Sequence, residues 1–216
     1  MNALCTDSRR PCAWTNSPWR RGIDIAGALA GLILTAPLHA GLALVVRVVD
    51  GRPVFFVQPR AGLGNRPFPL LKLRTMRRPE EASAERAAVD EGEEPEATGL
   101  GAFLRRLRLD ELPQLVNVLA GHMSLVGPRP EQPHLSDAYA RTIPRFRERL
   151  NVRPGITGLA QVSLPPGQGE EYSRRKLRFD IEYIEKASPL LDARILLKTV
   201  PSIWRNRNGV GPETRA

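Results

Sequence analysis

An uncharged apolar stretch lies near the N-terminus at residues 25–46, which read IAGALAGLILTAPLHAGLALVV. Its 22 residues match the length of a helix that crosses the hydrocarbon core of a bilayer. Pro37 lies in the middle, where it removes a backbone hydrogen bond and disfavours helix at the residue before it. The stretch therefore predicts a membrane-associated segment with a break at Pro37.

Positive charge flanks this stretch on both sides. Two arginines precede it and three follow it: Arg20, Arg21, Arg47, Arg52 and Arg60. Symmetric basic flanks set no orientation and favour both ends on the cytoplasmic face. A re-entrant helix–break–helix, with halves 25–36 and 38–49 each about 18 Å long, satisfies both observations. A kinked helix that spans the membrane and a buried helix of a soluble core remain as alternatives.

The 216 residues suffice for one domain with an appendage, and the net charge of +9 is unevenly distributed. Residues 77–96 carry a charge of −5, which leaves +14 on the rest of the chain. A surface this basic favours an anionic partner, such as nucleic acid, anionic lipid or a phosphorylated substrate. We expect the acidic stretch 77–98 to be a solvated loop without chemistry.

Hydrophobic periodicity outlines the remaining elements. Residues 1–18 are polar and predicted to be disordered. Two apolar runs around a Gly-containing loop predict a β-hairpin, residues 53–58 and 68–74. Helical spacing or strand-like composition predicts the other elements, namely helices 100–119, 137–150 (interrupted at Pro144), 170–187 and 190–204, and a short strand 159–162. The last helix suits either the membrane interface or a core.

Asp110 and Glu111 stand at the start of an apolar helical pattern, with Arg105, Arg106 and Arg108 just upstream. Asp110 suits the N-cap position, near the positive end of the helix dipole. An ionised Asp beside cationic side chains can act as a nucleophile toward a phosphoryl group. A plain helix cap is the alternative for this pair taken alone.

Two further arginines lie in rigid turns. Arg129 stands between two prolines, and Arg153 precedes Pro154 and Gly155. Such turns hold a side chain in place at low entropic cost, and a guanidinium binds phosphate oxygens through a planar fork. Lys72, in the second hairpin strand, points either to the same place or to solvent. Each residue alone also fits an ordinary surface position.

Five motifs in this order resemble the bacterial sugar transferase family, the monotopic polyprenyl-phosphate hexose-1-phosphate transferases. They are residues 55–58 (FFVQ), 72–76 (KLRTM), 109–119 (LDELPQLVNVL), 123–131 (MSLVGPRPE) and 153–162 (RPGITGLAQV). The resemblance covers residues 19–204 and corresponds to the short form of the family. Arg108 departs from it, because the family often has Ser there.

The resemblance implies an enzyme that moves a sugar 1-phosphate from a UDP-sugar to polyprenyl phosphate, usually undecaprenyl phosphate, and releases UMP. It implies a catalytic pair Asp110 and Glu111, Mg²⁺ held at Asp110, and phosphate-binding residues Lys72, Arg105, Arg129 and Arg153. Asp110 would form a covalent phospho-sugar intermediate. The membrane helix would break at Pro37.

The expected fold is therefore α/β and mainly α, with a re-entrant membrane hairpin (19–49), a small cytoplasmic catalytic domain with interfacial amphipathic helices (50–205) and a tail (206–216). The expected location is the cytoplasmic face of a bacterial inner membrane, in contact with membrane lipids and without nucleic acid. The sequence is also compatible with a homo-oligomer. The alternatives are a basic membrane-attached binding module and an inactive scaffold in a glycan-assembly complex. The pattern contains no aromatic stacking platform for nucleic acid.

Overall fold

The computed structural model describes residues 12–76 and 98–206, without the side chains of residues 203–206. Expectations for residues 1–11, 77–97 and 207–216 lie outside this range. Residues 12–18 were expected to be disordered, but they form η1 (Ala13–Asn16) and begin α1, because Cys12 and Trp14 are buried in the core.

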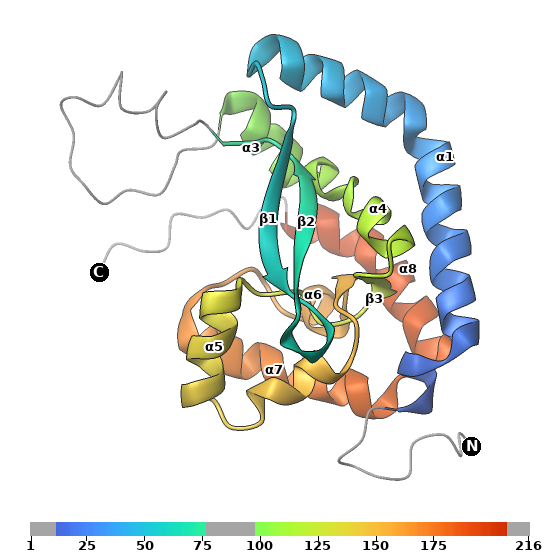
Figure 1. Ribbon diagram of the computed structural model, residues 1–216, viewed down its shortest axis with the longest axis vertical. Coiled ribbons are helices and arrows are strands. Elements are labelled where there is room, and N and C mark those ends of the chain that lie inside the picture. The colour runs from blue at the N-terminus through green and yellow to red at the C-terminus, as the bar shows by residue number, and fades with distance from the viewer. Residues whose placement is uncertain (1–11, 77–97, 207–216) are drawn as a thin grey trace, which may run out of the picture.

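Helix α1 (Pro18–Val49) is continuous and contains Pro37, so the expected break between two helices is wrong at the level of secondary structure. Figure 1 shows a bent helix that arches along one side of the molecule. Pro37 has no N–H to donate, and side chains bind carbonyls near it: Thr35 Oγ1 donates to Gly31 O (2.6 Å), and His39 Nδ1 lies 2.9 Å from Thr35 O. The break is therefore a bend within one helix.

By length and composition α1 could cross a membrane, a criterion that core helices of soluble proteins and signal sequences also meet. Only 6% of its most apolar window is buried against the rest of the protein. A helix of a soluble core would be mostly buried, so this interpretation of residues 25–46 does not fit.

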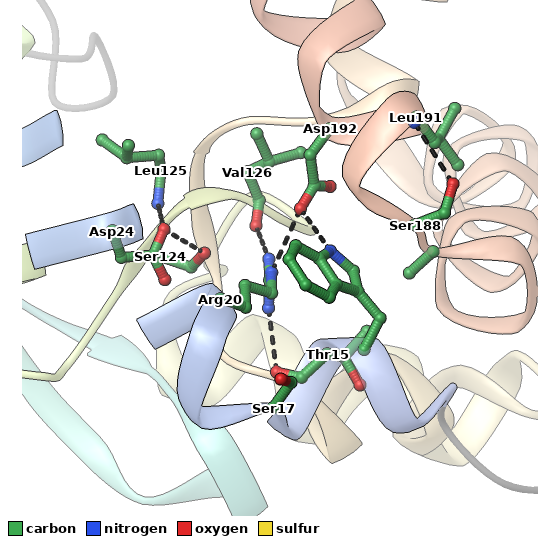
Figure 2. A network of polar contacts seen from close by, with 12 residues as sticks. Thr15, Ser17, Arg20, Asp24, Ser124, Leu125, Val126, Ser188, Leu191 and Asp192 are labelled. Carbon is green, nitrogen blue, oxygen red and sulfur yellow. Dashed lines mark hydrogen bonds and ion pairs between the residues drawn. The ribbon is translucent and has the colours of Figure 1, made fainter. Parts of the chain in front are cut away.

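Both ends of α1 contact the body of the protein. Near the start, Arg20 and Asp24 reach the strand β3 (Ser124–Val126), where Arg20 Nη2 donates to Val126 O and Asp24 Oδ1 accepts from Leu125 N (Figure 2). At the far end, Val46 is buried and Asp50, just after the helix, accepts a hydrogen bond from Thr98 Oγ1 (3.2 Å). The chain therefore leaves the body and returns to it.

The predicted hairpin is confirmed as β1 (Phe55–Ala61) paired antiparallel with β2 (Pro67–Leu73), with η2 (Leu63–Asn65) in the loop. Helix α4 (Gln114–Leu119) packs on β2, and the Asn117 side chain bonds both Leu71 N and Pro69 O. Ala28 of α1 joins Phe68, Val118 and Met123 in the core beneath the hairpin.

The single helix expected over residues 100–119 is divided into α3 (Gly99–Arg106), the 3₁₀ turn η3 (Leu109–Glu111) and α4. Arg108 adopts a left-handed conformation (φ 58°), which ends the α-helical path, and Pro113 cannot donate a backbone hydrogen bond. Asp110 and Glu111 therefore lie in the connecting turn, and the expected N-cap role of Asp110 is wrong.

The strand expected at residues 159–162 is a helix, α6 (Leu159–Ser163). The strand is instead β4 (Gly155–Thr157), which pairs in parallel with β3. Gly158, between β4 and α6, lies so close to Gly127 that a Cβ there would be 2.1 Å from the Gly127 carbonyl oxygen, so a larger residue does not fit.

The C-terminal half supplies the remaining helices: α5 (Pro133–Thr142), η4 (Phe146–Asn151), α7 (Gly169–Lys186) and α8 (Pro189–Asn206). The predicted interruption at Pro144 is confirmed, although the helix before it begins earlier than expected. In α8, Ile195 is buried, whereas Leu190, Leu197 and Val200 are exposed. This helix therefore has both a core side and a free apolar side.

Candidate active site

The two carboxylates lie together in η3, between α3 and α4, and face the hairpin. Asp110 and Glu111 are 4% and 8% exposed. Burying two adjacent carboxylates is costly unless cations or hydrogen bonds compensate them. The compensation is distributed unequally between the two side chains.

Glu111 is surrounded by cations. Arg129 holds it in a two-pronged contact, with Nη2 2.5 Å from Oε1 and Nη1 3.2 Å from Oε2. Arg108 Nη1 and Lys72 Nζ lie 3.3 and 3.5 Å from Oε1. Burial alone would raise the pKa of Glu111, but these cations, Arg129 above all, outweigh it and hold the pKa well below its usual range. Glu111 is therefore a fixed negative charge whose two oxygens are engaged.

Asp110 has the opposite environment. Its Oδ1 is buried and has no hydrogen-bond partner among the described residues. Burial raises the pKa of Asp110, the charge of Glu111 acts in the same direction, and Lys72, Arg105 and Arg108 offset part of the effect. A desolvated carboxylate with a free oxygen is the better nucleophile of the two.

Lys72 points into the site, which answers the question left open by its strand position. Burial lowers the pKa of Lys72, while the charge of Glu111 opposes that change. Arg105 is exposed on α3 and acts on Asp110 through its charge alone. Arg153 lies apart: its Nε donates to Gly121 O (3.1 Å), and no ion pair joins it to either carboxylate within the described part of the chain.

A buried ionic cluster supports the loop that carries Arg129. Arg149 Nη2 donates to the Arg129 carbonyl (2.7 Å) and pairs with Asp180 Oδ2 (2.9 Å). Glu131 pairs with Arg149 (3.4 Å) and with Lys176. The sequence signal for Arg149 was weak, because an arginine in a basic helix usually faces solvent.

A divalent cation fits one position in this site. Among the described residues no group of three or more His, Cys, Asp or Glu side chains could hold a metal. Mg²⁺, however, is commonly held by one or two carboxylates together with substrate phosphates and water. The unpartnered Asp110 Oδ1 suits such a ligand, whereas the oxygens of Glu111 are already engaged by Arg129.

A pocket of about 190 Å³ adjoins the carboxylates between α4, β4, α6 and α8. Arg108 and Glu111 form the end nearest η3. The pocket continues between Leu115 of α4 and Thr199 of α8, and Leu115 in turn packs against Gly31 of α1. Glu111 therefore borders both a cation cluster and a pocket that has apolar and polar walls.

The profile of the family described as bacterial sugar transferase matches residues 15–206. A UDP-glucose:undecaprenyl-phosphate glucose-1-phosphate transferase of Caulobacter vibrioides is 42% identical over 88% of this chain and 71% of its own length. A UDP-N-acetylgalactosamine-undecaprenyl-phosphate N-acetylgalactosaminephosphotransferase of Aeromonas hydrophila is 40% identical over 85% of this chain and 43% of its own length.

The exopolysaccharide production protein ExoY of Rhizobium meliloti is 33% identical, and the match covers 87% of this chain and 86% of that protein. The chain thus spans less than half of some relatives and most of others. The profile match and the extent of these identities lead to one conclusion: the chain belongs to the bacterial sugar transferase family.

Proposed function

We propose that this protein transfers a sugar 1-phosphate from a UDP-sugar to polyprenyl phosphate, with release of UMP, and so starts the assembly of a polysaccharide. The observation that carries the proposal is the unequal pair in η3: a carboxylate held as a fixed charge by Arg129 beside one with a free, desolvated oxygen. The names of the relatives support the substrate classes.

The chemistry follows from this asymmetry. An Asp110 oxygen attacks the phosphorus that bears the sugar, the bond from that phosphorus to the UMP oxygen breaks, and UMP leaves with the bonding electron pair. An oxygen of polyprenyl phosphate then attacks the same phosphorus and displaces the Asp110 carboxylate. Lys72 and Arg108, which lie 3.5 and 3.3 Å from Glu111 Oε1, would counter the charge of the diphosphate.

Mg²⁺ bound at Asp110 would offset negative charge on the diphosphate. Arg129 orients Glu111, and Glu111 holds Arg108 and Lys72 in turn. The order of steps predicts ping-pong kinetics.

We further propose that the catalytic body lies on the cytoplasmic face of the inner membrane, with α1 entering and leaving through that face. At about 1.5 Å per residue the 32 residues of α1 extend over roughly 48 Å, yet both ends contact the same body. The bend at Pro37 and the low burial of the helix support this arrangement.

The experiment is UMP release from a panel of UDP-sugars by membrane-embedded protein with Mg²⁺ and undecaprenyl phosphate. We expect release with at least one donor, and loss of it in Asp110→Asn, which keeps the shape of the side chain and removes its charge. A labelled donor without acceptor should leave label on wild-type protein and none on Asp110→Asn. Full activity in Asp110→Asn would contradict the nucleophile assignment.

A further inference from the structure

The pocket beside Glu111 has a polar wall with three hydroxyl groups, each of which already donates its proton to another protein atom. Thr199 Oγ1 donates to Ile195 O (2.8 Å), and Ser202 Oγ donates to Thr199 O (2.7 Å). Thr157 Oγ1 lies 2.8 Å from Thr199 Oγ1, so the proton in that contact belongs to Thr157. The three hydroxyl groups can therefore accept hydrogen bonds from a ligand but have no free proton to donate to it.

Gln161 adds a further acceptor to the same pocket. Its Nε2 donates to Ile156 O (3.0 Å), which fixes the orientation of the amide. Its Oε1 is buried and has no hydrogen-bond partner among the described residues. A buried carbonyl oxygen without a partner is costly, and a ligand that donates to it recovers that cost.

The rest of the wall is apolar, formed by Leu112, Leu115 and Ile156. An apolar wall opposite a few fixed hydrogen-bonding groups is typical of a site for a small neutral ligand. The charged end, with Glu111 and Arg108, adjoins the carboxylate pair where the phosphorus would react.

This chemistry excludes two parts of the substrates and leaves the two that carry hydroxyl donors, the hexose and the uridine. A polyprenyl chain has no hydrogen-bond donor for Gln161 or the hydroxyls, and a diphosphate offers only acceptors at neutral pH. A hexose ring offers several hydroxyl donors, and its C–H faces can lie on the leucines. Of the hexose and the uridine, only the hexose is attached through its oxygen to the phosphorus that must meet Asp110, whereas the uridine is attached to the other phosphorus.

We propose that this pocket binds the sugar ring of the donor, and that Gln161, Thr157, Thr199 and Ser202 recognise its hydroxyl groups. The inference rests on the proposed function and adds to it the residues that select the sugar. These four residues offer acceptors rather than donors to a ligand, and the one cation of the described lining, Arg108, lies at the end beside Glu111, so UMP binding should not depend on the four.

The test compares near-isosteric variants, Thr199→Val and Gln161→Leu, with the rescue variant Thr199→Ser. Ser136→Ala serves as a matched control, because it removes a buried hydroxyl on α5 outside the pocket. The measurements are KM for the UDP-sugar, the inhibition constant of UMP and KM for undecaprenyl phosphate. Thermal unfolding checks that each variant folds.

Loss of one neutral hydrogen bond should raise the KM for the UDP-sugar about 5- to 10-fold in Thr199→Val and Gln161→Leu. The other two constants should stay within about twofold, and Thr199→Ser and Ser136→Ala should resemble wild type. The ratio of kcat/KM between UDP-glucose and UDP-N-acetylgalactosamine should also change in the two variants.

Three results would overturn the sugar site. They are an unchanged KM for the UDP-sugar, an equal rise in the UMP constant (which would make the pocket a nucleoside site), and a rise confined to undecaprenyl phosphate. Each of these requires active wild-type protein. Absence of UMP release by the wild type with every donor would instead contradict the proposed function, and the sugar site would fall with it.

Discussion

Arg20 on α1 and Asp192 on α8 form an ion pair, with Nε 3.2 Å from Oδ2, although 172 positions separate them in the chain. The same Arg20 donates to Val126 O and to the Tyr183 hydroxyl (Figure 2 shows Arg20, Val126 and Asp192). Trp14 Nε1 donates to Asp192 Oδ2 (2.8 Å). This buried network joins α1 to both β3 and α8.

Arg20→Met should therefore destabilise the protein more than any exposed charge substitution. Removing one partner of a buried ion pair leaves an uncompensated charge and costs about 3–5 kcal/mol. Arg194→Met, at an exposed position of α8, should change stability by less than about 0.5 kcal/mol. Chemical unfolding in detergent measures both, and equal stability of the two variants would show that the network contributes little.

Arg129 and Arg153 give a matched pair for the phosphate-binding prediction. Arg129→Lys loses the two-pronged contact with Glu111, and we expect kcat/KM to fall at least about 100-fold. Arg153 contacts a backbone carbonyl away from the carboxylates, so Arg153→Lys should cost less than about tenfold. The measurement is UMP release, and a larger loss in Arg153→Lys would place that arginine in the reaction after all.

The hairpin and the long C-terminal helices could be predicted from sequence, because local periodicity and turn residues specify them. The turn at Asp110 could not. The leucine spacing continues through residues 107–113, and nothing local to Arg108 indicates its left-handed conformation. Likewise, the sequence of residues 159–162 suits a strand, and nothing local to it indicates the helix α6 that the chain forms there.

The site residues were predictable to different extents. Asp110, Glu111, Lys72 and Arg129 meet as expected, since the family motifs contain them. The pocket residue Thr199 lies on a helix for which the sequence suited the membrane interface and a core equally, and its partner Thr157 is 42 positions away. Only the packing of α8 on β4 brings them together, and no local pattern encodes that contact.

Glu131 predicts a pH-dependent contribution to stability. Burial alone would raise the pKa of Glu131, but Lys176 and Arg149 outweigh it and lower the pKa below the ordinary value. A carboxyl with a lowered folded-state pKa stabilises the protein above its unfolded-state pKa, and that stabilisation is lost as pH falls through the folded-state pKa.

Glu131→Gln should therefore cost about 2–3 kcal/mol at pH 7, since it leaves Lys176 and Arg149 short of a partner. The difference in the free energy of unfolding between Glu131→Gln and wild type should become smaller as the pH falls below about 4.5, where the unfolded-state carboxyl protonates. Unfolding curves across this pH range test it. Glu182→Gln, which breaks an exposed pair with Lys186, is the control and should show little effect at any pH.

Pro37→Ala should straighten α1, because alanine restores the N–H that can donate to the carbonyl of Ile33. A straighter helix would carry its far end away from the body and toward the opposite leaflet. Single cysteines at Asn16 and Arg47, both exposed positions near the two ends of α1, report the topology through labelling with a membrane-impermeant maleimide.

With Pro37 present, both cysteines should react from the cytoplasmic side only. With Pro37→Ala, Arg47→Cys should lose cytoplasmic reactivity while Asn16→Cys keeps it, because Arg20 and Asp24 still hold the near end to β3. Cytoplasmic labelling of both positions in Pro37→Ala would mean that the contacts at Val46 and Asp50, rather than the proline, set the course of the helix.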